Sequence, residues 1–187
     1  MKTRNLVFAA LGGAMAFVLM KLTAFPIFAT APFLKVEFSE IPLLIFAVMV
    51  SPGVGICAQL VKDVLMLFAG SNIFGVTSDF IAGATFILVF TYIVGKAPNY
   101  RRIAIATVLG PAARMVVAIP LNLVILWLEF GRTPAQTMAM MPVLLPFNLI
   151  KSLLGAVCFA LLYPQLRRIA PRLRPAPLPG ADKKNEV

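Results

Sequence analysis

Six apolar segments, separated by proline, glycine or short polar runs, are the feature that most constrains this chain. A helix needs about 20 predominantly apolar residues to cross the hydrocarbon core of a bilayer. The second segment is short for a full span and is expected to be tilted or partly re-entrant. The sequence therefore predicts an all-α integral membrane protein with six transmembrane helices. The segments run over residues 5–24, 39–51, 54–69, 76–95, 103–130 and 138–163.

The composition excludes a soluble globular fold. Of the 187 residues, 60% are apolar and 13% are charged, and the mean hydropathy is +0.94. Soluble domains are about 45–50% apolar and about 25% charged, so this chain has too few polar side chains to cover a water-facing surface. We expect a single membrane domain over residues 1–170 and a disordered cytoplasmic tail over residues 171–187, which are rich in proline and then polar.

The basic residues are distributed unevenly between the two sides. With the N-terminus inside, eleven of the 17 basic residues lie on the inner side, and only Lys21, Lys35 and Arg132 lie on the outer side. This positive-inside pattern predicts an even number of spans with both termini in the cytoplasm. The net charge of +10 thus reflects the orientation of the chain in the cell inner (plasma) membrane and favours attraction to anionic lipid. We expect no nucleic acid as partner.

The chain lacks the residues that histidine-based catalytic sites, metal sites and nucleotide-binding sites need. The chain has no histidine, its two cysteines (Cys57 and Cys158) stand far apart in apolar stretches, and it contains no GxxxxGK[ST] phosphate-binding motif. We therefore expect no enzyme activity, no catalytic residues, no cofactor and no metal. Any energised work would depend on a motor in another chain.

Polar side chains inside the apolar segments are the candidates for function. An ionisable side chain near the bilayer centre costs about 2.5–3.5 kcal/mol, so it usually faces a cavity or a partner. Five ionisable residues and two amides are in this position, namely Lys62, Asp63, Asp79, Arg114, Lys151, Asn122 and Asn148.

Depth along the helices groups four of these residues. Counted from the outer ends of their segments, Lys62, Asn122 and Lys151 lie about 12–14 Å deep at 1.5 Å per residue. Asn148 is three residues before Lys151 and shares its helix face. The sequence predicts a pocket open to the outside, with these four residues as candidates for binding a substrate.

Structural roles remain open for several of the polar residues. Lys62 can form an ion pair with Asp79 on the neighbouring helix, and Asp63 is expected to point away from Lys62. Arg114 can neutralise an acidic neighbour or contact the solute, and Asn122 can form an interhelical hydrogen bond. Asp63 and Asp79 are expected to be the only buried carboxylates.

Function is favoured for the pair Asn148 and Lys151, because Lys151 is too deep to reach either membrane interface. Its ammonium is expected to face a solute from outside the cell rather than a carboxylate.

Two further segments suit a binding protein. The outer loop over residues 25–38 mixes aromatic residues with proline, which favours a lid over the pocket or an aromatic anchor at the interface. The first helix carries small residues at i, i+4 spacing, which allow close packing against the protein's own helices or against a second polypeptide. These pairs are Ala9 with Gly13, Ala10 with Ala14, and Gly12 with Ala16.

Two sets of motifs carry a resemblance to a known family. They are FLKVEFSEIP at residues 33–42, followed by PGVG at 52–55 and QLVKD at 59–63, and PFNLIK at 146–151 with Leu162-Tyr163 downstream. From Asn5 to Arg168 the chain resembles the substrate-binding (S) component of energy-coupling factor (ECF) vitamin transporters, and it is most similar to the riboflavin-specific members. Glu37 and Glu40 stand where these members more often have aspartate, which leaves room for another vitamin.

The resemblance implies a six-helix binding protein whose outward pocket is covered by the loop after the first helix. It implies that Ala10 and Ala14 meet a transmembrane coupling (T) subunit, which two ATPase subunits power. It also implies that Asn122, Asn148 and Lys151 hold the riboflavin ring system.

Two other classes of function compete with a vitamin-binding subunit. One is a stand-alone ion-coupled carrier that uses Lys62, Asp79 and Arg114 as a relay. The other is an intramembrane enzyme with Asp63 and Asp79 as a carboxylate dyad, for which the sequence shows no motif.

Overall fold

The computed structural model describes residues 3–28, 34–95 and 98–173, with side chains described as far as residue 168. In these parts the chain forms six α-helices and one two-stranded antiparallel pairing, which confirms the predicted all-helical class. The elements are α1 (Thr3–Thr23), β1 (Phe25–Pro26), β2 (Lys35–Val36), α2 (Glu40–Met49), α3 (Pro52–Phe68), α4 (Ile73–Val94), α5 (Tyr100–Phe130) and α6 (Pro134–Leu173).

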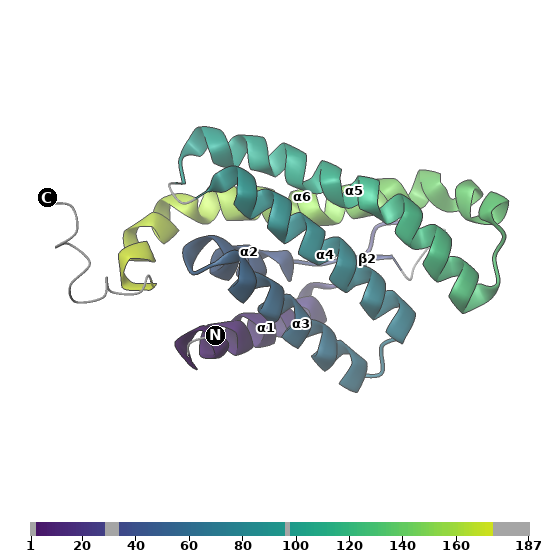
Figure 1. Cartoon of the computed structure of the whole chain (residues 1–187), viewed down its shortest axis with the longest axis horizontal. Coiled ribbons are helices and arrows are strands. Elements are labelled where there is room, and N and C mark those ends of the chain that lie inside the picture. Colours follow the sequence, from purple (N-terminus) through teal and green to yellow (C-terminus); the bar gives the residue numbers. More distant parts are fainter. Residues whose placement is uncertain (1–2, 29–33, 96–97, 174–187) are drawn as a thin grey trace, which may run out of the picture.

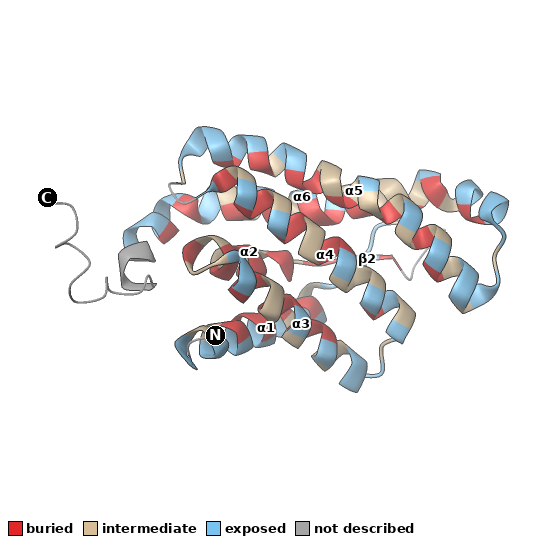
Figure 2. Cartoon of the chain, in the orientation of Figure 1, coloured by how far each residue is buried: buried red, intermediate tan, exposed pale blue. Residues whose placement is uncertain are grey.

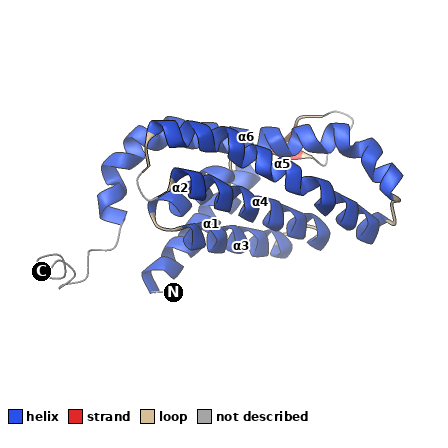
Figure 3. Ribbon diagram, turned by 45° about the horizontal axis from the view of Figure 1, so that its top comes forward, coloured by secondary structure: helices blue, strands red, loops and turns tan. Residues whose placement is uncertain are grey.

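The helices run back and forth between the two ends of an elongated bundle (Figure 1). The start of α1, the turn between α2 and α3, and the end of α6 lie at one end, and the α3–α4 and α5–α6 turns lie at the other. α1 packs on α3, α3 on α4, α4 on α5 and α5 on α6, while α2 contacts α1, α3, α4 and α6 from the middle (Figure 3). The central helix is therefore where residues from the two sides of the bundle meet.

Polar residues in the turns define where the helices begin. The Ser51 hydroxyl accepts a hydrogen bond from the Val54 N–H at 3.3 Å, directly before Pro52 at the start of α3. The side-chain oxygen of Asn72 caps α4 and that of Asn99 caps α5 in the same way. At the other end of α5, Gly131 has a left-handed backbone (φ 62°), which glycine adopts without steric penalty.

The second apolar segment is short, as predicted, and a buried extended segment precedes it. The 10 residues of α2 measure about 15 Å, half of the roughly 30 Å hydrocarbon core. The extended chain before α2 adds up to about 3.3 Å per residue. Irregular backbone is tolerated at membrane depth only where protein surrounds it, and Val36, Glu37 and Ser39 are all buried.

Buried and exposed residues are arranged as in a membrane protein (Figure 2). The aromatic rings of Phe86, Phe90 and Phe159 pack edge to face in the interior. Large apolar side chains such as Val108, Trp127 and Leu161 are exposed on the outside. Among the described residues, four helices are long and apolar enough to cross a membrane: Thr3–Thr23, Ile73–Val94, Tyr100–Phe130 and Pro134–Arg168.

Helix α6 continues to Leu173, three residues into the segment predicted as a disordered tail. Residues 174–187 of that segment lie outside the described residues, so the division into domain and tail remains a prediction.

Candidate functional site

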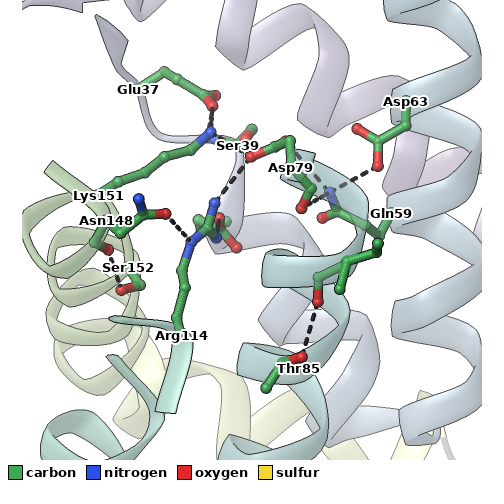
Figure 4. A network of polar contacts seen from close by, with 12 residues as sticks. Glu37, Ser39, Gln59, Asp63, Asp79, Thr85, Arg114, Asn148, Lys151 and Ser152 are labelled. Atoms are coloured by element: carbon green, nitrogen blue, oxygen red, sulfur yellow. Dashed lines mark hydrogen bonds and ion pairs between the residues drawn. The ribbon is translucent and has the colours of Figure 1, made fainter. Parts of the chain in front are cut away.

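Seven charged side chains meet in the interior of the bundle, in what is here named the charged cluster. Figure 4 labels Glu37, Asp63, Asp79, Arg114 and Lys151 among them. They comprise three cations and four carboxylates, and they come from all the helices except α1 and from the segment that precedes α2. The members are Glu37, Glu40, Lys62, Asp63, Asp79, Arg114 and Lys151. The cluster thus contains one more carboxylate than it has cations, in a space that is largely closed to water.

Asp79 on α4 joins three cations from three other helices. Its Oδ1 accepts hydrogen bonds from Arg114 Nη2 at 2.9 Å and from Lys151 Nζ at 2.8 Å, and its Oδ2 pairs with Lys62. The predicted ion pair of Lys62 with Asp79 is confirmed. Lys62 and Lys151, which were predicted to share a depth, thus meet at one carboxylate.

Arg114 on α5 is held by groups from three other helices. Its Nη1 pairs with Glu40 in the first turn of α2, and its Nη2 binds Asp79. Its Nε donates to Asn148 Oδ1 on α6 at 3.4 Å. The prediction that Arg114 neutralises acidic neighbours is confirmed, since the side chain is 1% exposed and faces two carboxylates.

Lys151 has a carboxylate partner on each side. Its Nζ lies 2.7 Å from Glu37 Oε1 as well as 2.8 Å from Asp79 Oδ1. The expectation that this ammonium is free of carboxylates is therefore wrong. The reason is that Glu37 and Glu40 are buried too, although only Asp63 and Asp79 were expected to be, because the extended segment before α2 enters the bundle.

Asp63 was expected to point away from Lys62, and this expectation is wrong. Its Oδ1 lies 3.2 Å from Lys62 Nζ, because a flexible lysine side chain can fold back to a neighbouring residue. Gln59, one turn earlier on α3, donates to Asp63 Oδ2 at 2.9 Å and to Asp79 Oδ2 at 3.4 Å. Asp63 therefore belongs to the charged cluster.

The two amides have different surroundings. Asn148 joins the charged cluster through Arg114, and its Nδ2 donates to the Leu144 carbonyl at 3.0 Å. Asn122 lies two turns beyond Arg114 on α5 and donates to the carbonyl of Ala118 on its own helix at 2.6 Å. Of the four candidate binding residues, the structure brings together Lys62, Asn148 and Lys151 and leaves Asn122 apart.

Besides Glu37, two residues of the site were not among the predicted candidates. Glu40 Oε2 and Gln59 Oε1 are buried oxygen atoms without a hydrogen-bond partner in the described part of the chain. Buried acceptors of this kind call for a donor such as water or a ligand. Both residues lie within the quoted motifs, and Gln59 precedes Asp63 by one helical turn, which is the signal that could have identified it.

The described parts of the loop over residues 25–38 pack beside the site. Leu34 is buried against Met141 and Leu144 of α6, and the Phe38 N–H donates to Thr23 Oγ1 at 3.1 Å. Residues 29–33 lie outside the described residues. A lid function for this loop remains a prediction.

The small residues of α1 divide between two faces. A Cβ on Gly13 would lie 2.6 Å from the Ala58 carbonyl oxygen, so the face with Ala9 and Gly13 packs against the protein's own α3. Ala10 and Ala14 are on the exposed face. Ala14 lines a hollow of about 400 Å³ there, together with Met15, Val18 and Leu19.

A second hollow, of about 490 Å³, lies between α5 and α6. Met115, Met138, Met141 and Leu149 are among the side chains that line it. Neither hollow is lined by a member of the charged cluster.

Comparison with known proteins gives a consistent result. The family model described as "ECF transporter, substrate-specific component" matches residues 4–163. The chain is 31% identical over 179 residues to the riboflavin transporter FmnP of Bacillus subtilis, covering 89% of this chain and 94% of FmnP. It is 30% identical over 183 residues to the riboflavin transporter RibU of Streptococcus thermophilus, covering 91% of this chain and 86% of RibU.

A solved structure agrees with these sequence relationships. It is described as the S component of a bacterial ECF transporter, and it matches with a TM-score of 0.76 and 28% sequence identity. The match covers 90% of this chain and 98% of the solved chain.

Proposed function

The chain belongs to the substrate-specific components of ECF transporters, and from this premise we propose that it binds riboflavin from outside the cell as the S component of such a transporter. Members of this family are integral plasma-membrane proteins and not enzymes. The observation that carries the proposal is the burial of Asn148 and Lys151 side by side in the charged cluster of a chain related over its length to riboflavin transporters.

The chemistry of the proposed site suits a flavin. The pyrimidine-like edge of the ring system presents carbonyls and an N–H. The amide of Asn148 offers both a donor and an acceptor, and the Lys151 ammonium offers donors. Apolar side chains near Asn148, such as Leu144 and Phe147, suit the dimethylbenzene end. Asn122 and Lys62 remain candidates for further contacts in this proposal.

The proposed orientation has six membrane passages and both termini in the cytoplasm. The arrangement of the bundle supports it, because the start of α1 and the end of α6 lie at the same end (Figure 1). The described basic residues support it too, since Arg4, Arg101 and Arg167 belong to that end and Lys21 and Arg132 to the other.

The proposed partners are a transmembrane T subunit and two ATPase subunits. The exposed face of α1 with Ala10 and Ala14 supports docking of the T subunit, because small residues allow a second helix to approach closely. Riboflavin is the transported ligand in this proposal and not a resident cofactor.

Titration of the purified chain with riboflavin, followed by quenching of flavin fluorescence, tests the proposal. We expect saturable binding with a submicromolar Kd. Lys151→Ala and Asn148→Ala should each weaken it by about tenfold or more, because a hydrogen bond to a charged group contributes about 1.5–3 kcal/mol.

Lys21→Ala is the matched control, since Lys21 is exposed at the end of α1 and should leave the Kd unchanged. Absence of binding by the wild type, or unchanged binding by both site variants, contradicts the proposal. Mass spectrometry of a copurified small molecule would then identify another vitamin.

A further inference from the structure

The carboxylates around Lys151 are not held equally. Asp79 is anchored within α4 by Lys62, Arg114 and Lys151, and Gln59 donates to it as well. Displacing Asp79 would break contacts to three other helices at once. It is the fixed acceptor in this part of the bundle.

Glu37 has far fewer attachments. It lies in the non-helical segment between β2 and α2, and its Oε1 contacts one cation, Lys151, at 2.7 Å. In the described part of the chain, its Oε2 accepts from the N–H of Ser39, two residues further along the same segment, at 3.3 Å. Nearby, the hydrogen bond from Phe38 to Thr23 joins this backbone to α1. The Ile41 N–H also donates to the Phe38 carbonyl at 3.2 Å, and β2 pairs with β1 just before Glu37. Outside these bonds the segment has no helical ladder, so it can shift locally at lower free energy than a packed helix can.

We propose that Glu37 is the exchangeable partner of Lys151 and that Asp79 is a positioning residue. The solute takes the place of the Glu37 carboxylate on the ammonium, while Asp79 keeps that ammonium aimed at the solute. This inference rests on the proposed function as a riboflavin-binding subunit.

The donor count and the charge balance both support the exchange. An ammonium has three N–H donors, so Lys151 can keep Asp79 while a carbonyl oxygen replaces Glu37. Once Glu37 leaves, three cations face three carboxylates in the remaining cluster. The incoming group then has to supply an acceptor atom but no charge, which matches the uncharged edge of a flavin ring.

The proposal predicts opposite effects for two similar substitutions. Glu37→Gln keeps the size of the side chain and removes the charge that competes with the solute, so the fraction of binding-competent protein rises. We expect the riboflavin Kd to fall by about three- to tenfold, since the apparent affinity scales with that fraction. Asp79→Asn removes the anchor of Lys151, and we expect the Kd to rise by about tenfold or more.

Fluorescence-quenching titrations of the full chain with riboflavin test this. Glu40→Gln is the matched control, because it makes the same chemical change in the same cluster, at a carboxylate that pairs with Arg114 and not with Lys151. It should not lower the Kd. If Asp79→Asn does not fold, Asp79→Glu serves instead. It keeps the charge while moving the carboxylate, and it should also raise the Kd.

The outcomes separate this inference from the proposed function. A wild-type chain that does not bind riboflavin refutes both. A wild-type chain that binds, together with a Glu37→Gln variant whose Kd is unchanged or higher, overturns the inference alone. It is also overturned if Glu40→Gln lowers the Kd as much as Glu37→Gln, or if the Asp79 variant binds like the wild type.

Discussion

Arg114 shows how far a single buried residue depends on its partners. Its guanidinium is 1% exposed and donates to side chains of Glu40, Asp79 and Asn148 on three other helices. Truncating one member of a buried ionic network leaves the others without compensation and destabilises by about 3–5 kcal/mol. Arg114 therefore contributes to the stability of the bundle mainly by preventing unpaired buried carboxylates.

We predict that Arg114→Met lowers the thermal unfolding midpoint of the detergent-solubilised chain strongly, because Glu40 is then left unpaired. The double variant with Glu40→Gln should recover part of the loss, since it removes that uncompensated charge. Arg101→Met, at an exposed position on the same helix, is the control. A midpoint for Arg114→Met within the error of the control would refute the prediction.

The sequence identified the ionic residues of the site better than it identified their partners. Helix depth grouped Lys62 with Lys151, and both ammonium groups reach Asp79. The same reasoning, from a rise of about 1.5 Å per residue, also grouped Asn122, which lies apart from the charged cluster. The partners of Lys151 were missed, since Glu37 belongs to an outer loop in any hydropathy pattern. Its burial depends on an extended segment that enters between helices, and this is a property of the assembled bundle.

At the scale of the elements, the contact between α2 and α6 depends on a glycine. A Cβ added at Gly155 would collide with the Cβ of Glu40, so α6 can approach α2 closely only without a side chain there. This contact brings the first turn of α2 within reach of Arg114.

We predict that Gly155→Ala destabilises the protein by about 1–3 kcal/mol through overpacking, even though alanine is the better helix former. Gly75→Ala on α4 is the matched control, because a Cβ there meets nothing within 4 Å. It should be neutral or stabilise by up to about 1 kcal/mol. Thermal unfolding of both variants measures the difference, and equal midpoints would contradict the predicted overpacking.

Helix positions were predictable because the breakers are local. Proline, glycine and polar capping residues act on the backbone next to them, so the predicted segment ends at residues 51 and 130 fall at the Ser51 N-cap of α3 and at the last residue of α5. The short α2 was also apparent. The sequence did not reveal that the extended chain before α2 is buried, because the helices that shield this backbone are distant in sequence.

For the whole molecule, the alternation of the helices predicts which turns face each compartment. Gly53 in the first turn of α3 and Ala135 at the start of α6 are exposed at opposite ends of the bundle. With Cys57 and Cys158 replaced by alanine, we expect Ala135→Cys to react with a membrane-impermeant thiol reagent in intact cells. Gly53→Cys should react only after the cells are opened. The reverse pattern would invert the proposed orientation.

The contact between Lys62 and Asp63 has a consequence for biosynthesis. Lys62 precedes Asp79 by 17 residues in the chain, so insertion in the order of the sequence brings Lys62 to the bilayer before Asp79. An unaccompanied lysine at that depth would resist insertion. Asp63 lies only 3.2 Å from the Lys62 ammonium, so α3 contains its own counter-ion. The two residues form a neutral pair without any contribution from α4. Arg114 and Lys151, by contrast, follow Asp79 in the sequence, so their counter-ion precedes them in the chain.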